Sequence, residues 1–232
     1  MKRRVTIPIL LTLSLLLGFI TWQPERGVQA IAPPLSPAVQ TVTNTNDSGA
    51  GSLRQAIADA ASGDTINFNL SGCPCTITLA SQLTIDKTLT ITGPGASNLT
   101  ISGNNAVRAF QVPAGGNLNL SGVTVANGNA GSDSGGGIEN RGTLTVSNST
   151  FSNNKGHFGG AIIGVDSSLT VTNSTFTGNI GQYGGGAIEQ INGTATISGS
   201  TFTGNSAPNS DAGAVDNFQA TMTVSNSTFT GN

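Results

Sequence analysis

The sequence has few charged residues. Lys, Arg, Asp and Glu together make up 9% of its 232 residues, against about 25% in an ordinary globular domain. This scarcity argues against a helical bundle, whose solvent-facing surfaces need Lys, Glu and Arg, and it favours strands joined by tight turns. A weakly charged polar chain can also be disordered, but the apolar residues recur here at regular intervals, which favours a folded structure.

Basic residues are especially scarce beyond the first thirty positions. Residues 31–232 carry five basic and ten acidic side chains, a net charge of −5, whereas the net charge of the whole chain is −2. Five scattered cations cannot form a continuous track along a phosphate backbone. We therefore expect no nucleic acid partner.

Histidine and cysteine are too few for most catalytic or metal sites. His157 is the sole histidine; it lies in the Gly-rich turn 155–159, where we expect a solvated side chain and no catalytic triad. Cys73 and Cys75 are the only cysteines and cannot supply the four ligands of a structural zinc site. A disulfide between them would close a very small ring, so two free or intermolecularly paired thiols stay open as the alternative. We expect no metal and no cofactor.

The first thirty residues have the three parts of a signal peptide. A basic start, Lys2 to Arg4, precedes an apolar core from Ile7 to Ile20, and small residues end the segment at Ala30. The core is too short to be a permanent membrane helix, which needs about 20 residues. We therefore expect cleavage after Ala30, export of the mature chain, and no membrane span thereafter. Residues 31–41 contain three prolines and predict an extended leader.

Residues 42–64 predict an N-terminal cap with an amphipathic helix over 52–62. Ser52 and Gln55 form a capping box at its start, and Gly63 follows its end. Its apolar face would consist of Leu53, Ala56, Ile57, Ala60 and Ala61. A helix in front of a long strand series can cover the open edge of the first strands, and we assign Arg54 to that structural role.

Residues 65–232 predict a right-handed parallel β-helix. Apolar residues alternate with polar ones in short segments such as Leu89–Ile91 and Leu144–Val146. A Phe-x-x-Asn motif then recurs every 25 to 27 residues, a period that is typical of a solenoid with three short strands per rung. Asn232 stands in the middle of a rung, so we expect the β-helix to continue in a longer protein.

Coiling with this period stacks like residues on like. An aromatic ladder would consist of Phe151, Phe176, Phe202 and Phe229, with Val125 one rung earlier. An aliphatic ladder would consist of Ile138, Ile162, Ile188 and Val215, and an amide ladder of Asn154, Asn179, Asn205 and Asn232. The Gly-Gly and Gly-Ala pairs would lie where the chain bends against the next rung.

Two motifs resemble exported bacterial proteins. Gly159–Ile162 and Gly185–Ile188 read Gly-Gly-Ala-Ile, each followed by Phe-x-x-Asn, and this pairing is similar to the repeats of the chlamydial polymorphic outer-membrane proteins and related surface β-helices. Ser52–Ile57 resembles the Ser-Leu-Arg-x-Ala-Ile opening of exported bacterial β-helix proteins. The resemblance implies a pectin-lyase-like fold, a place outside the cell or at the bacterial outer membrane, and the role of an adhesin.

The strongest catalytic candidates are Glu189 and Asp216. Together with Glu139 they share one place in the repeat, which Ile163 interrupts. On adjacent rungs their backbones would lie about 4.8 Å apart, and paired carboxylates can bind calcium or act as acid and base on a sugar, as in polysaccharide lyases and pectin hydrolases of this fold. No Lys, Arg or aromatic platform is repeated beside them, however, so we expect solvated side chains and no catalytic residue.

Together these observations predict a non-catalytic, exported and monomeric β-helix at a bacterial cell surface. Its rows of Thr, Ser and Asn would make many weak hydrogen bonds to a glycan or protein of a host, matrix or cell surface. The first alternative is a carbohydrate-active enzyme that uses Glu189 and Asp216. The second alternative is a structural stalk for a further C-terminal module.

Overall fold

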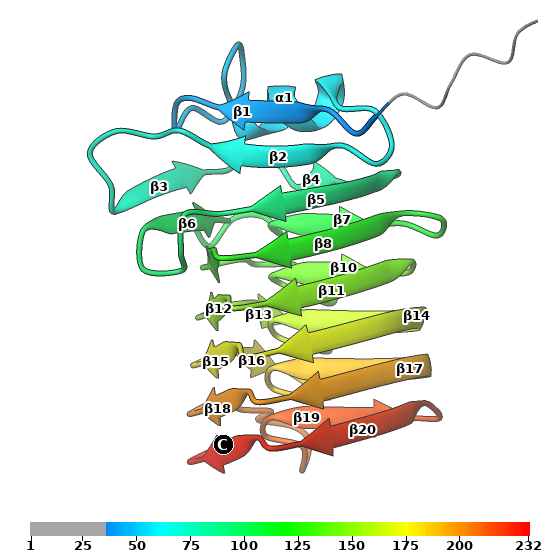
Figure 1. Cartoon of the computed structure of the whole chain (residues 1–232). Helices are drawn as coiled ribbons and strands as arrows, with labels where there is room; N and C mark the ends of the chain where they lie inside the picture. The colour runs from blue at the N-terminus through cyan, green and yellow to red at the C-terminus, as the bar shows by residue number, and fades with distance from the viewer. Residues whose placement is uncertain (1–35) are drawn as a thin grey trace, which may run out of the picture. The chain divides into compact units, whose positions relative to one another are not determined.

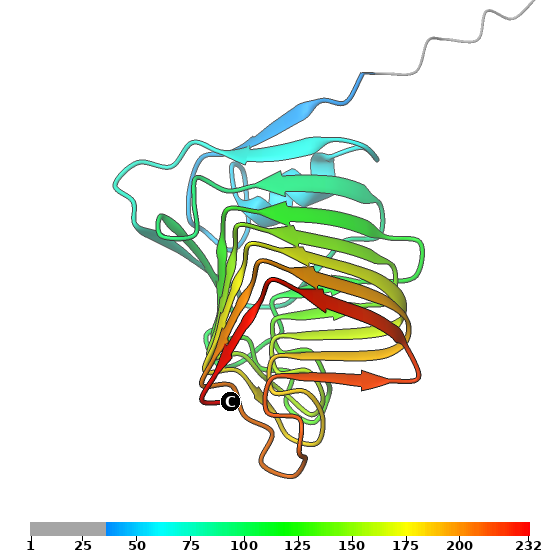
Figure 2. The ribbon, with the colours of Figure 1, turned by 60° about the horizontal axis from the view of Figure 1, so that its bottom comes forward.

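Three short strands recur in every turn of the chain, and equivalent strands of successive turns pair in parallel. The computed structural model describes residues 36–232, which form an all-β solenoid of about seven turns with about 26 residues per turn and one helix (Figure 1). The chain winds with a right-handed sense (Figure 2). The predicted right-handed parallel β-helix is confirmed. The expected signal peptide and residues 31–35 of the expected leader lie outside the described residues.

The strands form three faces. Face 1 consists of β4 (Leu83–Thr84), β7 (Phe110–Val112), β10 (Ile138–Asn140), the first halves of β14 (Ile162–Thr172) and β17 (Ile188–Ser198), and β19 (Val215–Phe218). Face 2 consists of β1 (Val39–Val42), β2 (Thr65–Phe68), β5 (Thr88–Thr92), β8 (Asn117–Ser121), β11 (Thr143–Ser147), the second halves of β14 and β17, and β20 (Thr221–Ser225). Face 3 consists of β3 (Cys75–Thr78), β6 (Leu99–Ser102), β9 (Thr124–Ala126), β12 (Thr150–Ser152), β15 (Thr175–Thr177), β18 (Thr201–Thr203) and β21 (Thr228–Thr230). Two further short strands, β13 (Lys155–Gly156) and β16 (Ile180–Gly181), pair in the turn between faces 3 and 1.

Apolar columns fill the interior. The rings of Phe151, Phe176, Phe202 and Phe229 stack in one column with centroids 4.7 to 5.0 Å apart, and Val125 pairs with Phe151 one rung earlier. A second column consists of Phe110, Ile138, Ile162, Ile188 and Val215. Because each apolar residue contacts the same kind of residue above and below, one rung specifies the packing of the next.

Buried asparagines form a hydrogen-bonded column at the turn that follows face 3. The Nδ2 atom of Asn154 donates to Oδ1 of Asn179 at 3.0 Å, and Asn179 donates in the same way to Asn205 at 2.9 Å. Asn205 in turn donates to Asn232 at 2.8 Å. The Oδ1 atoms of Asn179, Asn205 and Asn232 also accept the backbone N–H of the Asn one rung earlier, so the amides satisfy backbone groups that the bend would otherwise leave unpaired.

The first Gly-Gly-Ala-Ile segment, Gly159–Ile162, contains its two glycines for different reasons. Gly159 has a φ of +54°, a left-handed conformation that other residues adopt at a cost. Gly160 has no such dihedral, but a Cβ atom there would lie 2.3 Å from the carbonyl oxygen of Gly186 in the next rung. The first glycine therefore makes the bend, and the second lets two rungs approach each other.

The helix α1 (Leu53–Asp59) lies at the N-terminal end of the β-helix (Figure 1). Its Leu53, Ala56 and Ile57 are buried in the common core, so it covers the apolar edge of the first rungs. Arg54 donates to the carbonyl oxygens of Ser81 and Gln82 and forms an ion pair of 2.7 Å with Asp47. These contacts tie the helix to the loop that leads to β4, and they account for Arg54 structurally.

The helix is shorter than the predicted 52–62, and Gly63 does not end it. The backbone of Ala60 is already extended. The carboxylate of Asp64 accepts the N–H groups of Ala61 and Ala38, and these hydrogen bonds favour an extended chain over a further helical turn. Lys87 also donates to the carbonyl oxygens of the last turn. Ala61 is therefore exposed and does not belong to the apolar face. The capping box is half formed: Ser52 accepts from the Gln55 N–H, but the Gln55 side chain donates to Asp59.

The part of the expected leader from Val39 to Thr41 is a strand. It belongs to β1, which pairs in parallel with β2 through Val39↔Thr65 and the three pairs that follow. Within residues 36–232 no helix has the length and apolarity needed to cross a membrane.

Candidate functional site

Glu139, Ile163, Glu189 and Asp216 occupy one column of face 1. They pair in parallel register from β10 through β14 and β17 to β19. Their neighbours along each strand point into the core, so these four side chains point outward, beneath the turn that joins faces 3 and 1. The column is the one that the repeat predicts, and its members have different surroundings.

Glu139 is neutralised by two arginines. Its Oε2 lies 2.7 Å from Nη1 of Arg108, and its Oε1 lies 2.7 Å from Nε of Arg141. Arg108 is buried and also forms an ion pair of 2.7 Å with Asp133. Because both oxygens of Glu139 are used within the protein, this carboxylate is a structural ion-pair partner.

Glu189 is buried without a cation. Only 3% of the residue is exposed, and its Oε2 accepts the N–H of Gly185 at 2.7 Å. No Lys or Arg of residues 36–232 forms an ion pair with it. Burial, with a smaller contribution from the negative charge of Asp216 in the next rung, raises the pKa of Glu189 to about 7, although the Gly185 N–H opposes this shift.

A cleft of about 250 Å³ opens beside the two carboxyl groups. Its wall combines these acids with aromatic and aliphatic side chains, namely Phe158, Tyr183, Glu189, Ile191, Asp216 and Phe218. Tyr183 and Phe218 are 50% and 55% exposed, so their rings remain accessible. The expectation that no aromatic platform is repeated beside Glu189 and Asp216 is therefore wrong, and so is the expectation of a solvated Glu189, which is buried.

Stacking of the turns holds the aromatic wall in place. The N–H of Tyr183 donates to the carbonyl oxygen of His157 one rung earlier, at 2.9 Å. The His157 ring lies 4.6 Å from the Tyr183 ring and 4.8 Å from the Phe158 ring. The expectation of a merely solvated His157 is also wrong, because its ring packs against both aromatic side chains.

Phe158 and Tyr183 stand 25 residues apart, which is the repeat period, but they differ in residue type and each lies in a Gly-rich turn, so their spacing alone does not identify an aromatic wall. Phe158 and Tyr183 come from two turns, and Phe218 comes from a strand two rungs later than Phe158. Ile191 and Phe218 also pair in register, so an apolar side chain follows each acid by two positions. These two spacings were the available sequence signals for the wall. The cleft can present a protonated carboxyl donor, a second carboxyl group and aromatic ring faces to one ligand.

The cleft has too few ligands for a metal site in the described part of the chain. No three His, Cys, Asp or Glu side chains of residues 36–232 gather at distances that would hold an ion. Glu189 and Asp216 supply two carboxylates, whereas calcium takes six to eight oxygen ligands. Organic ligands are therefore better matched to the cleft than a cation.

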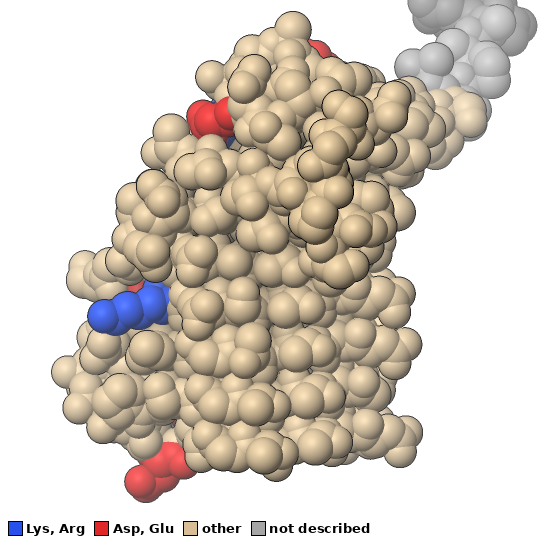
Figure 3. All heavy atoms as spheres, turned by 90° about the vertical axis from the view of Figure 1, so that its left-hand side faces the viewer, with Lys and Arg blue, Asp and Glu red and all other residues tan. Residues whose placement is uncertain are grey.

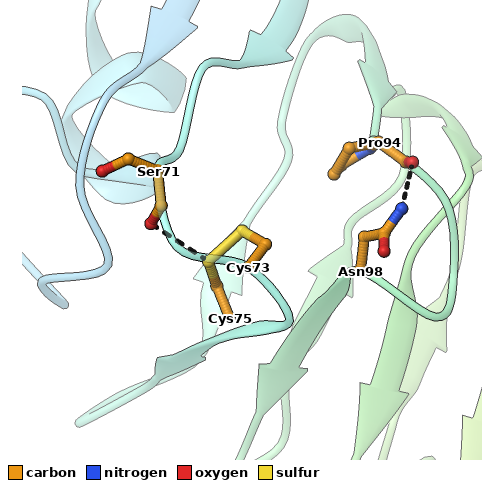
Figure 4. The surroundings of a disulfide bond; sticks show 5 residues. All are labelled: Ser71, Cys73, Cys75, Pro94 and Asn98. Carbon is orange, nitrogen blue, oxygen red and sulfur yellow. Dashed lines mark hydrogen bonds between the residues drawn. A yellow bond between two sulfur atoms is a disulfide. The ribbon is translucent and has the colours of Figure 1, made fainter.

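The two cysteines are joined to each other. Cys73, on the loop between β2 and β3, forms a disulfide with Cys75, the first residue of β3, and their Cα atoms are 4.4 Å apart (Figure 4). This separation lies within the range that disulfides require, a fact that sequence spacing does not reveal. The structure therefore decides between the alternatives in favour of the local disulfide. The loop lies apart from the cleft and shares no residue with it.

Comparison with known proteins does not assign a function to the cleft. No protein-family model matches the sequence, and no curated protein matches it. The functional argument therefore depends on the geometry of the site.

Proposed function

We propose that the protein is a non-catalytic, exported β-helix of the bacterial cell surface that binds a glycan in the cleft beside Glu189. One observation carries this proposal: Phe158, Tyr183 and Phe218 line the same cleft as two carboxyl groups. Aromatic faces can cover the apolar side of a pyranose ring, while carboxyl groups form hydrogen bonds with its hydroxyls.

The size and charge of the cleft limit the ligand. Its volume of about 250 Å³ lies below the roughly 300 Å³ at which pockets for drug-sized ligands begin. It therefore fits one terminal or protruding sugar ring better than an oligosaccharide. No arginine or lysine lines it, so a neutral sugar is favoured over a uronic acid, whose carboxylate would face Asp216 without a counter-charge.

Glycan binding is tested with a matched pair of variants. Tyr183→Ala removes an exposed ring of the cleft and should weaken binding on a glycan array at least tenfold. Tyr183→Phe keeps the ring and should bind nearly as the wild type does. Failure of the wild-type protein to bind any neutral glycan, or equal binding by Tyr183→Ala, would sink the proposal.

The environment of Glu189 favours polysaccharide cleavage as a second candidate function. A buried carboxyl group with a raised pKa can protonate a leaving oxygen, while the neighbouring Asp216 acts as a base or nucleophile. Neutral polysaccharides should then yield new reducing ends with the wild-type protein and none with Glu189→Gln or Asp216→Asn. Binding of a polysaccharide without any release of reducing ends would exclude cleavage, and non-catalytic glycan binding would then be the remaining function.

Export is part of the proposal. It is supported by the three-part organisation of residues 1–30, with its basic start and its small residues before Ala30. Mass spectrometry of the protein purified from a bacterial cell surface should find Ile31 at the N-terminus. A protein that retains Met1 in the cytoplasm would contradict export.

A further inference from the structure

The outward side of face 3 carries a regular lattice of hydroxyl groups. In β12, β15, β18 and β21 the central Phe points into the core, and the two flanking residues point outward. These outward positions form two columns, Thr150, Thr175, Thr201 and Thr228 in one and Ser152, Thr177, Thr203 and Thr230 in the other. Neighbours lie about 4.8 Å apart between rungs and about 6.6 Å apart along a strand.

The eight hydroxyls are free to bind water. Within the described residues none of them donates or accepts a side-chain hydrogen bond. The serines of the adjacent turn behave differently, since Ser149, Ser174 and Ser200 each donate to a carbonyl oxygen two residues earlier. The repeat therefore satisfies its turn hydroxyls internally and leaves the lattice of face 3 unpaired.

Face 3 is also free of charge over these strands. Figure 3 shows the side of the molecule on which β12 to β21 lie in Figure 1, and the surface over the strands has no charged side chain. The charged groups in that view lie toward one margin and the top. Strand propensity favours Thr on an outward side, but it equally favours Tyr, Trp, Val and Ile. None of these occupies the eight positions.

We propose that this lattice binds the surface of ice. Ice presents water oxygens in a neutral, periodic array, and the hydroxyl lattice of face 3 is likewise neutral and periodic in two directions. Threonine methyl groups restrict the orientation of neighbouring water, and the hydroxyls anchor that water by hydrogen bonds. Charged side chains would hold water in a different orientation, so the neutral face complements a neutral crystal.

Thr is the residue that this contact requires, because it supplies a methyl group and a hydroxyl on a side chain that is stiff at χ1. Seven of the eight lattice positions are Thr. The outward side of face 2 is also rich in hydroxyls, but serine interrupts it at Ser147, Ser168, Ser198 and Ser225. Face 3 is therefore the more regular lattice.

Crystalline polysaccharide is the competing periodic surface. Its flat sugar faces are contacted by rows of exposed aromatic rings, and the outward positions of β12 to β21 hold none. The ice site shares no residue with the glycan cleft on face 1. Either proposal can consequently fail without the other.

The test uses the purified exported protein and two lysine variants from the same rung. Thr177→Lys places a charged side chain in the lattice of face 3, whereas Thr170→Lys places it on face 2; both threonines are partly exposed and face outward. The measurements are the fraction of protein incorporated into a slowly growing ice hemisphere and the freezing-point hysteresis. Far-ultraviolet circular dichroism and the melting temperature check that both variants are folded.

The wild-type protein and Thr170→Lys should partition into ice, and Thr177→Lys should lose at least nine-tenths of that partitioning. Exclusion of the wild-type protein from ice would overturn the proposal. Loss of partitioning by Thr170→Lys alone would overturn the assignment to face 3. Retention of the wild-type protein on crystalline cellulose or chitin, together with exclusion from ice, would assign the lattice to polysaccharide instead.

Discussion

Glu139 and Glu189 occupy the same column of face 1, two rungs apart, but their carboxyl groups have opposite electrostatic surroundings. Glu139 lies 2.7 Å from both Arg108 and Arg141. Glu189 has no such partner among the described residues and faces Asp216 in the next rung. The two residues therefore provide a matched comparison between an ion-paired carboxyl group and one without a cationic partner.

Replacing Glu189 should flatten the pH dependence of stability. The pKa of Glu189 is raised from 4.5 to about 7 in the folded protein, so between these pH values the folded state holds a proton that the unfolded chain has released. The free energy of unfolding consequently falls as the pH rises from about 4.5 to about 7, by roughly 3 kcal/mol. Glu189→Gln should lose this dependence in urea unfolding at pH 5 and pH 8. An unchanged slope would contradict the assignment.

Replacing Glu139 should lower the free energy of unfolding at neutral pH. Glu139→Gln removes one carboxylate from the buried guanidinium of Arg108, and breaking a buried ion pair costs about 3 to 5 kcal/mol. The remaining Asp133 is more exposed and compensates in part. Urea unfolding at pH 7 measures the loss. A change below about 1 kcal/mol, the range of exposed ion pairs, would show that this network is solvated.

Removing one amide from the asparagine column should destabilise the whole solenoid. Asn179→Ala leaves the buried side chains of Asn154 and Asn205 each without one partner. An unsatisfied buried polar group costs about 1 to 3 kcal/mol, so we expect a total loss of roughly 3 kcal/mol in urea unfolding. The control is Asn173→Gly, at an exposed position with a φ of +48°, which glycine accommodates readily. Equal losses in both variants would argue against the column.

The stacked phenylalanines should differ in their contribution to stability according to burial. Phe202→Ala empties a fully buried site between two stacked rings and should cost about 3 to 5 kcal/mol. Phe229 is 46% exposed in the last described rung, and Phe229→Ala should cost less than half as much. Thermal unfolding followed by circular dichroism compares the two. A larger loss for Phe229→Ala would contradict the packing described here.

The architecture could be predicted because the core residues of a solenoid recur in the sequence once in every rung. Phe151, Phe176 and Phe202 recur at the period that places each directly over the next, and the outcome is a stack of rings about one strand spacing apart. The end of the cap helix could not be predicted in this way. It depends on the carboxylate of Asp64, which accepts an N–H group from Ala38, 26 residues away. A pattern of neighbouring residues contains no information about a contact between residues so far apart in the sequence.

By itself the sequence determined the period, the strand pattern and the residues that face the core, because parallel stacking requires like residues at equal intervals. Only the tertiary structure decided which of two equivalent glutamates is neutralised. Arg108 contacts Glu139 across a rung, and Tyr183 and Phe218 line the cleft at Glu189 from separate segments. Arg108 has no counterpart at the equivalent position of other rungs, and the aromatic residues come from different strands and turns, so only the coiled chain brings each group of side chains together.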